Sequence, residues 1–292
     1  MSRPPPASGE QRTPTHRFAV GLARAVGGAI IFGLPLLMTM EMWSLGFYMD
    51  RLRLALLVAL TVPLLVGLSH VSGFEDTFDV KEDTVDAFVA FAVGFVVGAG
   101  VLALFGVLRG GMPASEVTGK VALQAVAGSI GALLAQSQLG DRGDSDGEAS
   151  SGDGAGERRR RRQSYWSQLF LMAAGSLFLA FNVAPTEEMV LISYMMGPAH
   201  VLAMATVSLV VMHTFVYAVE FSGQERTSPG TPFWSVFLRF TVVGYAVALV
   251  ISAYVLWTFG RLDDTAWAER ATTVLVLGFP ASVGAAAARL IL

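Results

Sequence analysis

The residues best suited to bind a cation or a proton surround one interruption in a long apolar run, Phe181 to Met189 (Phe-Asn-Val-Ala-Pro-Thr-Glu-Glu-Met). A shorter version of this stretch occurs 147 residues earlier (188 − 41), around Glu41, with threonine, glutamate and methionine in the same register. A carboxylate in hydrocarbon costs ~2.5–3.5 kcal/mol on insertion scales, so it normally faces a cavity or a partner. We therefore predict a cation- or proton-binding site in which neutral oxygens supplement the carboxylates. Its candidate residues are Glu41, Glu188, Glu187, Thr39, Thr186 and Asn182.

The depth of these carboxylates in the membrane leaves a second interpretation open. Glu188 lies 22 residues after Trp166, which corresponds to about 33 Å of helix at ~1.5 Å per residue. That distance places Glu188 near the outer interface, where a carboxylate at a helix end meets water without any further function. In the functional interpretation, Glu41 and Glu188 approach each other across a twofold axis and share a proton or a metal cation.

A second polar group lies on one face of a later apolar helix. Thr206, His213, Tyr217 and Glu220 recur at spacings of 7, 4 and 3 residues, so they share a helical face. We predict that His213 relays protons, because the charge of histidine changes near neutral pH. The structural alternative is a hydrogen-bonded network between helices. Arg239, at a similar depth in the next helix, is expected to pair with Glu220.

Signatures of enzymes and of metal centres are missing from the sequence. It has no Gly-x-Ser-x-Gly, no phosphate-binding glycine loop and no His-Glu-x-x-His. The chain has no cysteine and only four histidines, none of them at zinc-ligand spacing. We therefore expect neither catalysis nor a cofactor nor a bound metal centre. Lys120 follows Glu116 by four residues, a favourable spacing for an ion pair on a helix, although Lys120 could instead reach the outer carboxylates.

Composition places the chain in the membrane. It is 292 residues long, 53% hydrophobic and only 15% charged, against about 25% charged residues in a typical soluble domain. Several apolar runs reach the ~20 residues that a helix needs to span ~30 Å of hydrocarbon. The net charge of −3 suggests no nucleic-acid partner, so the expected partners are the lipid bilayer, a small cation or proton, and a second copy of the chain.

We predict an all-α, polytopic membrane helical bundle of eight helices in two parallel four-helix repeats. Residues 1–15 form a disordered cytoplasmic tail, residues 16–139 the first repeat, residues 140–163 a flexible arginine-rich linker, and residues 164–292 the second repeat. The expected helices are Phe18–Trp43, Arg53–Phe74, Ala87–Leu108, Glu116–Gln138, Tyr165 to the Pro185 stretch, Ala199–Phe221, Phe233–Phe259 and Thr272–Leu292.

Matching glycines support the repeat. Gly28 matches Gly175 in the register of the glutamates, and Gly131 matches Gly284 in the last helix of each half. The spacing Gly94-x-x-x-Gly98 and its neighbour Gly106-x-x-x-Gly110 are typical of helices that approach closely.

The distribution of arginine and lysine predicts the orientation. With the N-terminus inside, twelve basic residues, including Arg158 to Arg162, fall on the cytoplasmic side and five fall outside. We therefore expect a bacterial plasma (inner) membrane protein with both termini in the cytoplasm.

The stretches Glu41–Met49 and Phe181–Met189, with Val242-Val243-Gly244-Tyr245 and Gly278-Phe279-Pro280-Ala281, resemble an uncharacterised family of bacterial integral membrane proteins. The resemblance covers residues 18–292 apart from the linker, and it implies the class without implying an activity. The leading functional prediction is a cation- or proton-coupled transporter or channel that uses paired outer-side carboxylates. The alternative is a structural or accessory membrane protein that binds a partner through its glycine-rich helix faces.

Overall fold

The computed structural model describes residues 14–72, 80–140, 164–221, 234 and 237–291. Within these ranges the chain is helical, with short turns between the helices and no strand. Eight of the helices are long and apolar enough to cross a membrane. The predicted fold class, an all-α membrane bundle with eight spans, is therefore confirmed. The predicted tail and linker fall almost entirely outside the described residues.

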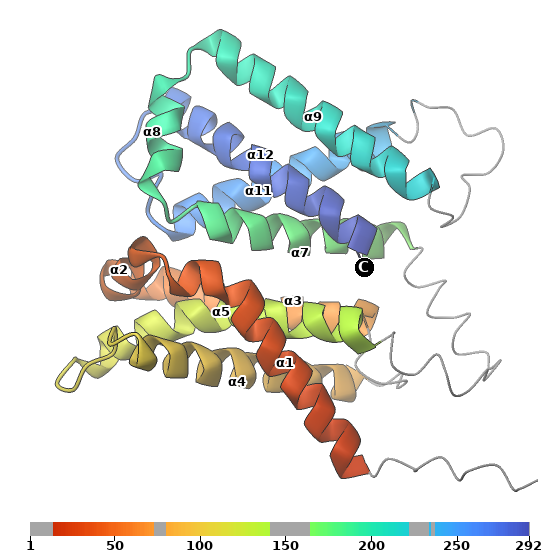
Figure 1. The fold of residues 1–292 in the computed structure, drawn as a ribbon. Coiled ribbons are helices and arrows are strands. Elements are labelled where there is room, and N and C mark those ends of the chain that lie inside the picture. Colours follow the sequence, from red (N-terminus) through yellow and green to blue (C-terminus); the bar gives the residue numbers. More distant parts are fainter. Residues whose placement is uncertain (1–13, 73–79, 141–163, 222–233, 235–236, 292) are drawn as a thin grey trace, which may run out of the picture.

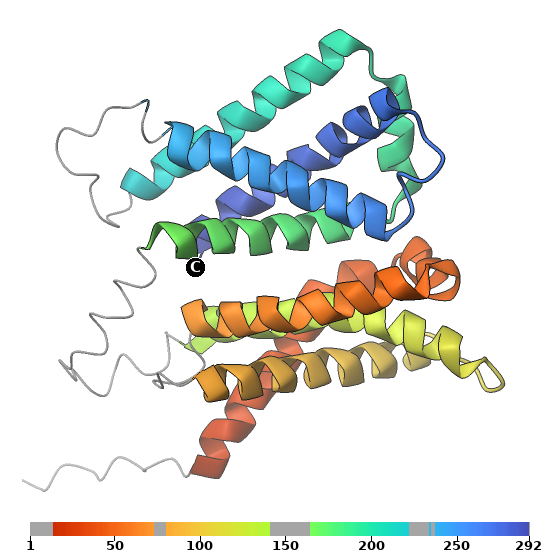
Figure 2. The ribbon, with the colours of Figure 1, turned by 180° about the vertical axis from the view of Figure 1, so that it is seen from behind.

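The first half of the chain forms a layer of four long helices and one short one (Figures 1 and 2). Helix α5 is its centre: 78% of its most apolar segment is buried, and it contacts every other helix of this half. The elements are α1 (Pro14–Leu37), α2 (Met40–Tyr48), α3 (Arg51–Ser72), α4 (Val80–Leu104) and α5 (Ala114–Gly140).

The second half has the same order of elements, which is a long helix, a short helix and three further spans. The middle one of these three spans begins as a π-helix. Its last helix, α12, is the central one and packs on α7, α8, α9 and α11. The elements are α7 (Tyr165–Val183), α8 (Glu187–Met195), α9 (Pro198–Phe221), η1 (Phe237–Val242), α11 (Val243–Thr258) and α12 (Trp267–Ile291).

The two short helices, α2 and α8, lie at the same end of the molecule, which we call the short-helix end; the opposite end, where α1 and α7 begin, is the linker end (Figure 1). The sequence did not predict either short helix. The first predicted helix was wrong at its end: α1 stops at Leu37, and Trp43 belongs to a separate helix. The third was wrong at its start, because α4 begins at Val80 and not at Ala87.

Glycines allow the closest helix contacts inside each half. A Cβ atom added at Gly28 in α1 would lie 2.5 Å from the carbonyl oxygen of Gly131 in α5. In the second half, a Cβ atom added at Gly175 in α7 would lie 2.5 Å from the Cβ atom of Ala288 and would collide with Gly284 in α12. The residues matched in sequence thus make the same helix contact in both halves, which supports the predicted repeat.

The two predicted small-residue spacings have different outcomes. Gly94 and Gly98 lie on the face of α4 that packs on α5, next to Ser129 and Gln124, as their spacing indicates. The prediction for the second spacing was wrong, because Gly106 lies in the turn after α4 with a φ of +69° and has no neighbour within 4 Å of its missing Cβ.

The two halves meet along a narrow surface formed by α1, α3 and α5 on one side and α7 and α11 on the other. Its best-defined contact is at the short-helix end, where Arg53 of α3 binds both carboxylate oxygens of Asp263 at 2.8 and 3.0 Å. The same guanidinium donates to the carbonyl oxygen of Trp257 at 2.8 Å and lies over its indole ring. Towards the linker end, Gly67 of α3 packs on the ring of Phe170.

Candidate functional site

The threonines and glutamates singled out in the sequence mark the starts of the two short helices. Thr39 is the N-cap residue of α2 and Thr186 that of α8, each with an extended backbone conformation. Glu41 lies in the first turn of α2, and Glu187 and Glu188 lie in the first turn of α8. A carboxylate in the first turn is stabilised by about 0.3–1 kcal/mol through the helix dipole, so both helices favour negative charge at this point.

The methionines of the matching stretches explain why the short helices dock in the same way. Met42 and Met189 follow the glutamates and are buried, at 0% and 2% exposure. One turn further along, Gly46 of α2 packs on the backbone of Lys120, whereas Ser193 of α8 accepts a hydrogen bond from Thr273 of α12 at 3.0 Å. Each short helix thus buries one face against the central helix of its half and leaves its glutamates at the edge.

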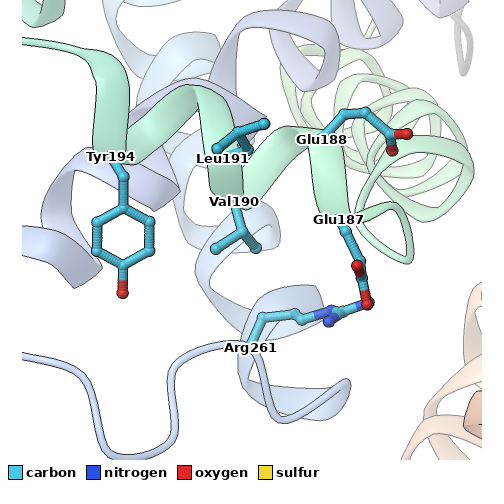
Figure 3. A pocket seen from close by; sticks show the side chains of 6 residues that line it. All are labelled: Glu187, Glu188, Val190, Leu191, Tyr194 and Arg261. Carbon is cyan, nitrogen blue, oxygen red and sulfur yellow. The ribbon is translucent and has the colours of Figure 1, made fainter.

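Glu187 and Glu188 open onto a cavity of about 510 Å³ at the short-helix end (Figure 3). Both carboxylates belong to exposed residues, so water reaches them. The lining residues are Glu187, Glu188, Val190, Leu191, Tyr194 and Arg261.

Arg261 divides the two carboxylates into different environments. Its half-buried guanidinium donates a hydrogen bond to the carbonyl oxygen of Pro185, which fixes the turn before α8. The side chain extends towards Glu187, whereas Glu188 points away from it on the other side of the helix (Figure 3). Glu188, the residue with a counterpart in the first half, is therefore the carboxylate that Arg261 does not approach.

The expected neutral oxygens do not line this cavity. Asn182 donates from Nδ2 to the carbonyl oxygen of Phe178 at 2.8 Å, within its own helix. Thr186 donates to the carbonyl oxygen of Val183 at 2.9 Å. In the first half, Thr39 likewise donates a hydrogen bond to the carbonyl oxygen of Pro35 at 2.5 Å. These side chains end the preceding helices, and a bound ion would meet them only through their remaining lone pairs.

Glu41 lies at the short-helix end of the first half and is not among the residues that line the cavity of α8. Its approach to Glu188 stays a prediction. Of the two partners considered for Lys120 in the sequence, the structure gives it Glu116, whose Oε1 atom lies 2.6 Å from its Nζ atom. That ion pair confirms the spacing of four residues noted in the sequence, and both of its side chains are largely buried.

The predicted polar stripe on α9 is only partly brought together. Nδ1 of His213 lies 2.8 Å from Oγ1 of Thr241 in η1. Thr206 is exposed and donates to the carbonyl oxygen of Leu202 in its own helix. Arg239 is exposed, and its backbone carbonyl accepts a hydrogen bond from the Tyr165 hydroxyl at 3.2 Å.

The expected pair of Glu220 with Arg239 remains a prediction. Tyr217 and Glu220 belong to the end of α9, where the side chains lie outside the described part of the chain.

A further polar cluster was missed in the sequence. At the linker end Ser69 donates to Asp83 and to Asp86, both at 3.3 Å, and His70 Nδ1 lies 2.7 Å from Asp83 Oδ2. Asp83 is 8% exposed. Both aspartates fall between the predicted helices Arg53–Phe74 and Ala87–Leu108, although acidic residues just before an apolar run are a common sign of a first helical turn.

No group of three or more histidine, aspartate or glutamate side chains is placed to hold a metal ion in the described part of the chain.

Comparison with protein families gives one match. Residues 21–292 match the family described as "Putative integral membrane protein (DUF2391)". Comparison with curated proteins and with solved structures finds no match.

Proposed function

We propose, on the premise that the chain belongs to this family of integral membrane proteins, that it moves a proton or a small monovalent cation across the membrane. The observation that carries the proposal is the open cavity beside Glu187 and Glu188, at the end of a membrane-spanning half. Glu188 is the ion-binding group, Arg261 holds the turn that presents it, and Glu41 is its counterpart in the first half. The short-helix end faces the outside in this proposal, and both termini lie in the cytoplasm.

The arrangement of the two halves supports transport by relative movement. Each half packs around its own central helix, while the contact between the halves is narrow. Parallel repeats that rock against each other around a shared site are a known design of secondary transporters. The proposal places the binding carboxylates at equivalent positions of two such units.

The alternative, an accessory protein that binds a partner through glycine-rich faces, has less support. Gly28, Gly94, Gly98 and Gly175 all pack on helices of the same half. A partner would therefore have to use other surfaces.

The test is ion flux in proteoliposomes that contain the purified protein and an internal pH-sensitive dye. A potassium gradient with valinomycin supplies the driving force, and the monovalent cation is varied. Glu188→Gln is expected to reduce the rate about tenfold, the effect of losing about 1.4 kcal/mol of ion-binding free energy. Glu41→Gln is expected to act in the same direction.

Glu269→Gln is the matched control. Glu269 lies in the first turn of α12 and accepts a hydrogen bond from the Ala266 backbone, a role that glutamine can take over. The proposal fails if the unaltered protein gives no flux above empty liposomes, or if Glu188→Gln is as active as Glu269→Gln.

A further inference from the structure

Thr241 lies in the only π-helical turn of the described residues, η1, which joins directly onto α11. Such turns are rare and occur frequently at functional sites. The turn places two groups on one imidazole: Oγ1 of Thr241 lies 2.8 Å from Nδ1 of His213, and the ring of Phe237 packs edge-on against it at 5.2 Å between centroids. Thr241 is fully buried, at 0% exposure.

A hydroxyl group is suited to a ring that changes its protonation state. It donates to Nδ1 when the imidazole is neutral and accepts from Nδ1–H when the imidazole is charged. A backbone carbonyl could only accept, so it would hold the neutral ring in the tautomer with the proton on Nδ1. When Thr241 donates to the neutral ring, the ring proton lies on Nε2, and when Thr241 accepts from the neutral ring, the ring proton lies on Nδ1.

We propose that His213 and Thr241 form a proton-accepting site in the second half, with Thr241 as the positioning residue that donates to Nδ1 of the neutral ring and so fixes the tautomer of His213. An ionisable residue within a membrane-spanning helix is a functional candidate by default. The contact joins two spans, α9 and the η1–α11 helix, through two residues that are 28 positions apart in the sequence. The first half has Val66 at the position of His213, so the site belongs to one half only.

The elements around the imidazole carry several titratable or charged side chains. Those that the structure describes are His200 on α9, Tyr165 on α7, Arg239 on η1, Tyr245 and Tyr254 on α11, and Glu269 and Arg270 on α12, whereas the side chains of Tyr217, Glu220 and Arg289 lie outside the described part of the chain. Arg239 is exposed, and the α12 pair lies at the opposite end of the bundle. Tyr245 lies beside Ser208, whose proton goes to the Met204 carbonyl.

The role of this site in transport rests on the proposed function, because it would supply the proton step of a coupled carrier. It lies towards the linker end, whereas the cavity of α8 lies at the short-helix end, so the second half would have one proton- or cation-binding group near each side of the membrane. The hydrogen bond and the tautomer of His213 can be tested without any transport.

The test is ¹⁵N NMR of the histidine side chains of the full chain in nanodiscs. The chain has four histidines, and His213→Gln identifies the signals of His213 by their loss. In the unaltered protein we expect one tautomer, with the proton on Nε2 at high pH, and reversible protonation between about pH 5 and pH 8. Thr241→Val, which keeps the shape and removes the hydroxyl, should give a mixture of tautomers, while Thr241→Ser should preserve the single one.

Thr206→Val is the control, because Thr206 is exposed on the same helix as His213 and bonds only its own backbone among the described contacts. The inference is overturned if Thr241→Val leaves the His213 signals unchanged, or if the ring stays neutral across the whole range. In proteoliposomes Thr241→Val should alter the pH profile of flux, and Thr206→Val should not.

The two proposals fail separately. Tautomer changes in a protein without flux would reject the transport function and leave the histidine site standing. Flux that is lost in Glu188→Gln, with no response of His213 to Thr241→Val, would reject the histidine site alone.

Discussion

Gly28 and Gly27 are neighbours on α1 with opposite surroundings, which makes them a sensitive test of the packing described here. A Cβ atom added at Gly28 would lie 2.5 Å from the carbonyl oxygen of Gly131 and would also collide with the Cβ atom of Ala135. A Cβ atom added at Gly27 would have no neighbour within 4 Å. We predict that Gly28→Ala destabilises the protein and that Gly27→Ala does not.

The magnitude follows from what the two substitutions share. Both gain the helix propensity of alanine over glycine, about 0.8–1.0 kcal/mol, so this term cancels in the difference between them. What remains is the packing term at Gly28. The obstacles are the Gly131 carbonyl oxygen and the Ala135 Cβ atom, which cannot move without the backbone of α5. Because carbon atoms in contact normally lie about 3.5–4.0 Å apart, α1 and α5 must separate by roughly 1 Å. Overpacking of this kind costs about 1–3 kcal/mol, and a backbone obstacle favours the upper part of that range.

The assay is reversible unfolding by SDS in mixed micelles, with the free energy of unfolding of each variant compared with the unaltered protein. Gly175→Ala is expected to fall in the same range as Gly28→Ala, because it collides with Gly284 and Ala288 in the equivalent contact of α7 with α12.

Equal stability of Gly28→Ala and Gly27→Ala would refute the packing argument. If Gly28→Ala is destabilised and Gly175→Ala is not, the contact stands in the first half, but the predicted repeat loses its best support.

Two further predictions concern ion pairs. Arg53→Ala removes the ion pair with Asp263, the hydrogen bond to the Trp257 carbonyl and the contact with the Trp257 ring, so it should lower the free energy of unfolding by about 1–3 kcal/mol. Asp263→Asn weakens only the partly exposed ion pair and should lower the free energy of unfolding by about 0.2–1 kcal/mol. Equal losses of unfolding free energy in Arg53→Ala and Asp263→Asn would mean that the contacts with Trp257 add no stability. Lys120→Met leaves the largely buried Glu116 without its partner and should lower the free energy of unfolding by about 3 kcal/mol. The double variant that also carries Glu116→Leu should recover most of this loss, and SDS unfolding measures both values. A double variant no more stable than Lys120→Met would contradict a desolvation cost at this pair.

Interactions between near neighbours could be predicted from the sequence because they depend on local geometry alone. Mean hydropathy over a span is a local property, and the eight spans follow from it. The pair of Glu116 and Lys120 needs only the helical spacing of four residues. The glycines at 28 and 175 could likewise be matched in sequence, although their contacts could not.

Breaks within an apolar run were not predictable in the same way. Residues 18–43 form one apolar run, yet α1 ends at Leu37 and the chain turns into α2. Pro35 lies inside α1 and does not mark the break. The short helix is stabilised by burying Met42, Leu45 and Gly46 against α5, and such tertiary packing leaves no trace in local hydropathy.

The sequence by itself determined the class of protein, its eight spans and the carboxylates worth testing. It could do so because the free-energy cost of placing a residue in the hydrocarbon of the membrane depends on the type of the residue. Only the tertiary structure decided which polar groups meet. Arg53 binds Asp263 across 210 residues, and Thr241 meets His213 across 28 residues of chain and a π-helical turn. Such contacts depend on how each helix is rotated about its axis and how deep it sits against its neighbour, and many residues far apart in the chain fix these two quantities together.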